Sequence, residues 1–413
     1  MDEKFIRFIK DTSKEKRRLA KVKEMARDTS LDPKPIEVVT LQPTSNIFSN
    51  WAIIFGADVH SAAVGSNAVR EELALAWVKD TANALYIPGG DLVNSIIKAD
   101  QNAHDDKFGN QDAIMREISL LIPIVDKIPL MLDGNHDGEN GNRFNASNMS
   151  PTRHILDALR TYSEAGYVGP EHCKYGGLLK IVIPTSDNKR ELKTVGIYFH
   201  HGSGRGSGPA SVDSEKTKAI AYLNSIGETA DAIITGHHHS NADGVFEQNV
   251  VQKNASGLVE HIISKTAHVV SESTLQETAN YGLANGLAPV DSNVYIYDFQ
   301  LERNPAYNNK TAGEQPEYIV ICTRIPMFRK NSNELTPKAK RYMLEHMEPD
   351  RKKLLSQIER TNTEKLYKQL DRQNRTVNTS SFINLKNFLN EKAEAKDKPK
   401  PVIPDDEDVM VRG

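Results

Sequence analysis

The sequence predicts an α/β domain with a mixed sheet, or two packed sheets, and helices on the outside. Short apolar runs with the length of buried strands recur between residues 46 and 325. Helical stretches lie between several of these runs. Five of the runs end directly in polar segments that contain Asp, Asn or His. Because open α/β sheets bind ligands beyond the carboxyl ends of their strands, these segments form the candidate site.

The apolar runs and the helical patterns alternate along the chain. The five runs that end in polar segments are residues 51–57 (WAIIFGA), 84–90 (ALYIPGG), 128–134 (IPLMLDG), 194–200 (TVGIYFH) and 231–236 (DAIITG). Four further β-like runs are residues 178–184, 266–271, 293–300 and 317–323. The helical patterns cover residues 68–83, 112–126, 152–166 and 214–226.

Length and composition favour a soluble globular protein. A chain of 413 residues accommodates one large domain of roughly 250 residues with appendages, or two ordinary domains. No apolar run approaches the roughly 20 residues of a membrane span, and the charged N-terminus is unlike a secretory signal. The two cysteines, Cys173 and Cys322, exclude a disulfide framework and disfavour a thiolate metal site. We therefore expect a cytoplasmic protein with no membrane partner.

The charge is distributed unevenly. The net charge is −3, but it is about +4 over residues 1–28, about +8 over residues 326–400 and about −12 over residues 29–325. We expect a charged N-terminal helical arm (1–45), the α/β domain (46–325), a basic helical extension (326–395) and a disordered acidic tail (396–413). An acidic centre suits metal-binding carboxylates, and basic flanks suit a polyanion such as nucleic acid.

The extension has two predicted faces. An apolar stripe suggests packing on the core or on a partner helix. The basic side chains form a solvated face or, if they line one surface, a nucleic-acid contact. They are Lys352, Lys353, Arg360, Lys365, Lys368, Arg372 and Arg375.

The polar segments at the five strand ends carry oxygen and nitrogen donors that suit Mn²⁺, Fe or Zn²⁺. Residues i and i+2 at a strand end point the same way, so both can reach one metal or two adjacent metals. Glycines before Asp91, Asn135 and His237 let the backbone turn sharply and approach the ions. The segments are Asp58-Val59-His60, Gly90-Asp91-Leu92-Val93-Asn94, Gly134-Asn135-His136-Asp137, His200-His201-Gly202 and Gly236-His237-His238-His239.

The motif series of residues 51–239 resembles that of the calcineurin-like metallophosphoesterase superfamily. In chain order the motifs are D-x-H, G-D-x-x, G-N-H-D, H and G-H-x-H. The resemblance implies a four-layer αββα sandwich of two mixed sheets flanked by helices, with residues 46–325 as the catalytic domain. It also implies two divalent metal ions, with Mn²⁺ expected before Fe or Zn²⁺. Carried over by motif, one metal is held by Asp58, His60, Asp91 and His239. The second is held by Asp91 as a bridge, Asn135, His200 and His237.

The resemblance further assigns roles around these metals. A water bridging the two ions attacks phosphorus in line, and His136 is the general acid for the leaving group. Asp137 is expected to orient the His136 imidazole. We favour His200 over His201 as the ligand because it comes directly off the strand and because the family often has His, any residue, then Gly or Pro there. His201 would then contact the ligands from outside or face substrate. Arg205, in the glycine-rich segment 202–208, is a candidate phosphate contact.

The residues within the motifs favour a phosphodiesterase or nuclease. Protein Ser/Thr phosphatases of this superfamily carry GDxxDRG and GNHE, whereas this chain has GDLVNS and GNHDGE. Superfamily nucleases often have an acidic residue or His where Asn94 stands, and HHGSGRGSGP is similar to phosphoesterases of phage genomes. A phosphomonoesterase or small-nucleotide hydrolase is the alternative. A third reading is a catalytically idle binding or scaffold protein. The sequence predicts no oligomeric state.

Overall fold

The computed structural model divides the chain into two compact units, Met1–Lys353 and Leu354–Gly413, and all described residues belong to the first. The predicted extension beyond residue 347 and the acidic tail therefore lie outside the described residues. The described residues are 6–9, 37–43, 48–63, 65–94, 109–137, 150–162, 169–185, 192–202, 209–237, 242–253, 259–271, 293–307, 316–330 and 332–347.

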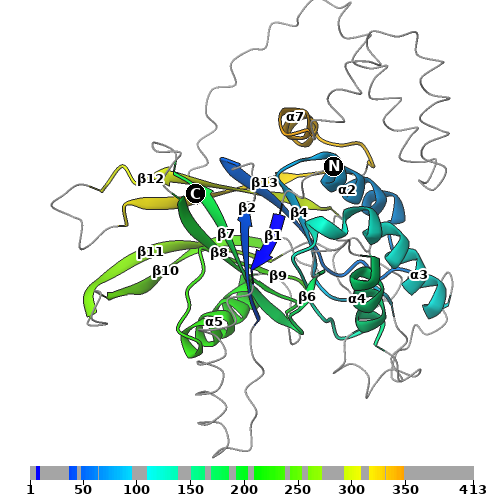
Figure 1. The fold of residues 1–413 in the computed structure, drawn as a ribbon, viewed down its shortest axis with the longest axis horizontal. Helices are drawn as coiled ribbons and strands as arrows, with labels where there is room; N and C mark the ends of the chain where they lie inside the picture. Colours follow the sequence, from blue (N-terminus) through cyan, green and yellow to red (C-terminus); the bar gives the residue numbers. More distant parts are fainter. Residues whose placement is uncertain are drawn as a thin grey trace, which may run out of the picture. The chain divides into compact units, whose positions relative to one another are not determined.

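Two mixed sheets form the centre of the fold (Figure 1). Parallel pairs such as β2–β7 and β8–β9 occur beside antiparallel pairs such as β7–β8 and β12–β3. The seven-stranded sheet has the order β1 (Ile6–Ile9), β2 (Glu37–Pro43), β7 (Gly176–Pro184), β8 (Leu192–His200), β9 (Ala232–Thr235), β11 (Val259–Ser271) and β10 (Ala242–Lys253). The four-stranded sheet has the order β13 (Tyr318–Pro326), β12 (Tyr295–Arg303), β3 (Asn50–Gly56) and β4 (Ala84–Pro88). A short pair, β5 (Leu130–Met131) and β6 (Glu171–His172), stands apart.

The main hydrophobic core lies between the two large sheets. Alternate residues of β3 and β8 point into it, and the Phe55 and Phe199 rings are 5.4 Å apart across it. The residue before Phe199, Tyr198, points the other way and packs with Leu223 in a second cluster under α5. The strand alternation thus buries one face of β8 between the sheets and the other under a helix.

Helices cover both sheets. On the seven-stranded sheet, α5 (Pro209–Ser225) contacts β9, β10 and β11. Near the four-stranded sheet lie α2 (Ala68–Asp80), α3 (Asn110–Leu121), the 3₁₀ helix η1 (Ile122–Lys127) and α4 (Pro151–Tyr162), which contact one another (Figure 1). The predicted α/β sandwich of two mixed sheets flanked by helices is confirmed.

The N-terminal segment differs from its prediction. We expected a helix there, but Ile6–Ile9 is strand β1, which pairs with β2 in the seven-stranded sheet. β2 was not predicted as a strand, and it lies before the expected domain start at residue 46. The helix prediction is wrong for these strand residues, because pairing with a distant strand outweighs local helix propensity. The proposed domain boundaries stay predictions.

The last described helix, α7 (Pro337–Glu345), packs on the α/β unit. The Tyr342 hydroxyl donates to Asp298 Oδ1 (2.8 Å) and accepts from the Asn50 side-chain amide (2.9 Å). The Trp77 indole N–H of α2 donates to the Ala339 carbonyl (3.2 Å). Residues 337–345, expected in an appended extension, are thus joined to the four-stranded sheet by buried hydrogen bonds.

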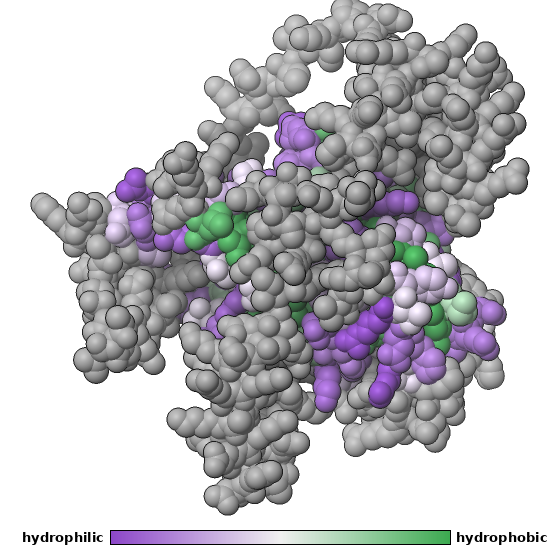
Figure 2. Space-filling model, in the orientation of Figure 1, coloured by the Kyte–Doolittle hydropathy of each residue, from purple (hydrophilic) through white to green (hydrophobic). Residues whose placement is uncertain are grey.

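The face shown in Figure 2 is mostly hydrophilic where residues are described, with smaller hydrophobic patches. No helix in this part of the chain combines the length and the apolar character that a membrane span requires. The exposed large hydrophobic side chains of the described residues come from several different elements: Val69, Met115, Tyr162, Leu192, Tyr222 and Val245.

Candidate metal centre

The segments after β3 and β4 run side by side at the carboxyl ends of these parallel strands. The ladder continues past the strands, because Asp58 N–H donates to the Gly90 carbonyl (3.1 Å) and His60 N–H to the Asp91 carbonyl (2.8 Å). One residue further, Ser61 N–H donates to the Leu92 carbonyl (2.7 Å). The D-x-H and G-D segments are therefore held against each other by their backbones.

The backbone at this edge is strained at the predicted ligands. Six non-glycine residues of the described chain have positive φ, and four of them are Asp58 (54°), His60 (48°), Asp91 (52°) and His237 (69°). A left-handed conformation is uncommon outside glycine and costs on the order of 1–3 kcal/mol, and such residues cluster at functional sites. The fold therefore holds these four residues in a backbone conformation of higher free energy, which orients their side chains toward the site.

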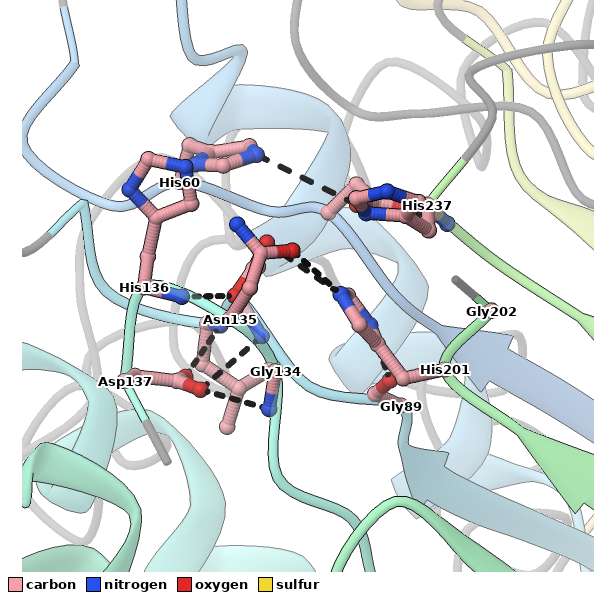
Figure 3. Close-up of polar contacts among 12 residues, drawn as sticks. His60, Gly89, Gly134, Asn135, His136, Asp137, His201, Gly202 and His237 are labelled. Atoms are coloured by element: carbon pink, nitrogen blue, oxygen red, sulfur yellow. Dashed lines mark hydrogen bonds and ion pairs between the residues drawn. The ribbon is translucent and has the colours of Figure 1, made fainter. Parts of the chain in front are cut away.

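The carboxylates and imidazoles converge in two groups that share Asp91. Figure 3 shows the four imidazoles of these groups, which belong to His60, His136, His201 and His237. Within each group the donor atoms lie within 4.8 Å of one another. One group consists of Asp58, Asp91, His201 and His237, and the other of His60, Asp91 and His136. A carboxylate common to two donor groups is the arrangement that two adjacent cations require.

The G-N-H-D segment closes over the shared carboxylate. Asn135 Oδ1 lies 3.2 Å from His201 Nε2, and the His136 backbone N–H donates to Asp91 Oδ1 (2.7 Å). The His136 ring meets the His60 ring edge-on, with the centroids 5.0 Å apart. The structure therefore brings Asn135 and His136 to the predicted cluster from a third strand end (Figure 3).

Two glycines permit this close approach. A Cβ atom on Gly134 would overlap the Asp91 carboxylate, and one on Gly90 would lie 2.6 Å from Gly134 N. Gly90 also has φ of +89°, a conformation that side chains rarely adopt. The left-handed conformation of Gly90 agrees with the predicted sharp turn before Asp91, and the approach of these glycines to metal ions stays a prediction.

Comparison with known proteins agrees with this geometry. Residues 52–241 match the sequence model of the calcineurin-like phosphoesterases. This part of the chain belongs to the calcineurin-like phosphoesterase family. The search of curated proteins found no significant relative of the chain.

Two solved structures, each 12% identical in sequence, are similar to this chain. The calcineurin-like phosphoesterase YfkN from Bacillus subtilis aligns over 72% of this chain and 96% of its own, with a TM-score of 0.30. A conserved uncharacterized protein from Streptococcus pneumoniae TIGR4, described as a predicted phosphoesterase, aligns over 67% of this chain and 99% of its own, with a TM-score of 0.25.

Among the described residues, His201 joins the candidate donor groups, whereas we expected His200 there. His201 Nε2 lies 3.2 Å from Asp91 Oδ2, and its ring is 5.3 Å from the His237 ring. His200 instead stacks on Tyr198, and its Nδ1 lies 3.3 Å from Glu215 Oε2 of α5. This geometry favours His201 over the expected His200, because strand alternation puts residue 201 on the inner face with Phe199 and residue 200 on the helix face with Tyr198.

The hydrogen bonds of His201 fix the orientation of its ring. Its Nδ1 lies 2.9 Å from the Gly89 carbonyl, which can only accept, so Nδ1 carries the hydrogen and Nε2 faces the Asp91 carboxylate. Burial alone would lower the pKa of His201, but the Asp91 carboxylate raises it to about 10. Burial alone would raise the pKa of Asp91, but the imidazoles of His201, His136 and His60 hold it well below its usual range. The pocket therefore favours positive charge at the Nε2 position.

Asp137 has a role that we did not predict. Its carboxylate accepts the backbone N–H groups of Asp91 (3.1 Å), Leu92 (2.6 Å) and Gly134 (2.9 Å). Burial and the nearby Asp91 carboxylate raise the pKa of Asp137 to about 6. The side chain thus joins the G-D and G-N-H-D segments (Figure 3), and the orientation of the His136 imidazole by Asp137 stays a prediction.

The donor set of the described site fits the two metal ions on which the family depends. Carboxylate, amide and imidazole donors are present together, and Nδ1 of both His60 and His201 contacts an oxygen, at Asn94 (3.3 Å) and Gly89 (2.9 Å). Such outer contacts orient the other ring nitrogen toward a metal. Of the remaining predicted residues, His239 and Arg205 lie outside the described residues.

Proposed function

We propose that this phosphoesterase hydrolyses phosphodiester bonds with two divalent cations, with Mn²⁺ as the first metal to test and Fe or Zn²⁺ as alternatives. The observation that carries the proposal is the Asp91 carboxylate, which offers a donor atom within 4.8 Å of donor atoms of Asp58, His201 and His237 and also of His60 and His136. Two bound cations lower the pKa of a water between them and neutralise the phosphoryl oxygens. The GNHD motif and the basic flanks of the sequence favour a phosphodiester substrate. Nucleic acid is the first substrate class to examine.

The proposed ligands follow the family motifs with one change. Asp58, His60 and Asp91, with His239, would hold one ion. Asp91, Asn135, His237 and His201, which replaces His200, would hold the other. The close approach of Asn135 to His201 and of His201 to Asp91 supports this exchange.

His136 is the proposed proton donor to the leaving oxygen. Its backbone is anchored on Asp91, and its ring is partly exposed beside His60. A general acid must be at the edge of the site, within reach of the leaving group. The position of the ring agrees with that requirement and leaves its proton accessible to substrate.

A substrate panel tests the proposal. With Mn²⁺, wild type should cleave bis-p-nitrophenyl phosphate and single- or double-stranded DNA, whereas activity on p-nitrophenyl phosphate alone would overturn the diester assignment. Asp91→Ala should lose both metal and activity, and His136→Ala should keep the metal and lose turnover. Protein purified without chelator that contains no metal would instead favour the scaffold reading. We also propose a cytoplasmic location, which the presence of only two cysteines in the sequence supports.

A further inference from the structure

A short segment connects the two loops that carry Asn135 and His201. Glu171 and His172 pair with β5, and Asp133 N–H donates to the Lys174 carbonyl (2.6 Å). At its other end the segment accepts the His201 backbone N–H through the Tyr175 carbonyl (2.9 Å). Residues 171–175 therefore contact both sides of the site through backbone hydrogen bonds.

One side-chain pair in this segment lies outside the motif series. His172 Nε2 is 2.8 Å from Asp133 Oδ1, and the Asp133 side chain is fully buried while that of His172 is 18% exposed. Among the described residues, the other carboxylate oxygen of Asp133 is buried and has no hydrogen-bond partner. A buried carboxylate with so few donors depends strongly on each one, because desolvation of a charge without hydrogen bonds is costly. His172 is therefore the side chain that holds Asp133 in place.

Asp133 packs against the segment that carries the Asp91 carboxylate. Its carbonyl group is packed against Gly90, where an added Cβ would lie 2.7 Å from Asp133 O. The next residue, Gly134, leaves no room between its Cα and the Asp91 carboxylate. A displacement of Asp133 would therefore move Gly134 against Asp91 and move Asn135 away from His201, since the three residues are consecutive in a tightly packed turn.

We propose that His172 is a positioning residue for the metal centre, acting through Asp133 on Asn135 and Asp91. This inference rests on the proposed metal-binding function. His172 belongs to neither donor group found among the described residues, so it acts on the ligands without being one. Removing an outer side chain that orients metal ligands without binding the metal typically changes metal affinity 10–100-fold.

Calorimetric titration of the metal-free, full-length protein with Mn²⁺ tests the inference. His172→Ala should weaken the binding of at least one ion about 10–100-fold. His172→Gln should recover part of that loss, because its amide can donate to the carboxylate, whereas the shorter His172→Asn should not. The Asn variant replaces the Ala variant if His172→Ala fails to fold.

A matched control separates positioning from general stability. His346 follows the last residue of α7 and is partly buried. It stacks on Tyr342 and contacts its carbonyl, so His346→Ala should lower the unfolding temperature and leave Mn²⁺ affinity unchanged. Unchanged Mn²⁺ affinity in His172→Ala would overturn the positioning role and leave the proposed function intact. If Mn²⁺ affinity is weakened in His172→Ala but the wild type cleaves no phosphodiester, the positioning role of His172 is supported and the proposed phosphodiesterase activity is overturned. A wild type that binds none of Mn²⁺, Fe²⁺ and Zn²⁺ would overturn both.

Discussion

Replacing Gly134 by Ala tests whether the close packing around Asp91 matters for metal binding. The added methyl carbon would overlap the Asp91 carboxylate and lie within 3 Å of its backbone nitrogen, so the two loops must separate. Overpacking of this kind costs about 1–3 kcal/mol of folding free energy. Because the atom to be displaced is a proposed bridging ligand, we expect Mn²⁺ binding to suffer in addition.

The loss of metal binding has a calculable thermal signature. At an Mn²⁺ concentration of 100 times the wild-type Kd, one bound ion stabilises the protein by about 2.7 kcal/mol. A variant with 100-fold weaker binding would gain only about 0.4 kcal/mol under the same conditions. Melting curves with and without Mn²⁺ should therefore show a shift of several degrees for wild type and almost none for Gly134→Ala.

Gly109→Ala is the control for this experiment. Gly109 precedes α3, its backbone is extended, and a Cβ there meets nothing within 4 Å. This variant should keep the full Mn²⁺-dependent shift. If Gly134→Ala also keeps it, the reasoning from loop packing to metal binding is refuted.

Three further substitutions give distinct outcomes. His201→Ala should abolish binding of one Mn²⁺ while His200→Ala retains both ions, as measured by metal analysis after gel filtration; the reverse would restore our original sequence assignment. Asn94→Ala removes the oxygen 3.3 Å from His60 Nδ1 and should lower Mn²⁺ affinity about tenfold or more in calorimetry, with no change counting against an orienting role. Arg116→Met leaves two buried glutamates without their guanidinium partner and should cost about 3–5 kcal/mol in urea unfolding, whereas a loss below 1 kcal/mol would contradict the pairing.

Much of the site was predictable because its position is set by strand ends. Apolar runs located β3, β4 and β9, and the residues that follow them come together as expected. The choice between His200 and His201 was also decidable, since Val195, Ile197 and Phe199 already mark the inner face by alternation. The motif resemblance favoured His200, whereas the strand periodicity favours His201.

Other features had no comparable signal in the sequence. The partners of Asp137 are backbone N–H groups, which every residue except proline carries, so the sequence could not distinguish this role from contact with His136. The His172–Asp133 pair joins residues 39 positions apart and becomes visible only when β5 and β6 align. β1 was misread because Phe8 and Ile9 fit a helical stripe as well as a short strand.

The order of strands in the smaller sheet limits how this protein can be shortened. The family match ends at residue 241, yet β12 is hydrogen-bonded along β3, at the centre of that sheet. Removing everything after the matched region would leave β3 with an unpaired edge and open one wall of the inter-sheet core. A fragment intended for expression or for transfer into another enzyme must therefore retain the strands and the α7 helix that return to the sheet from far downstream.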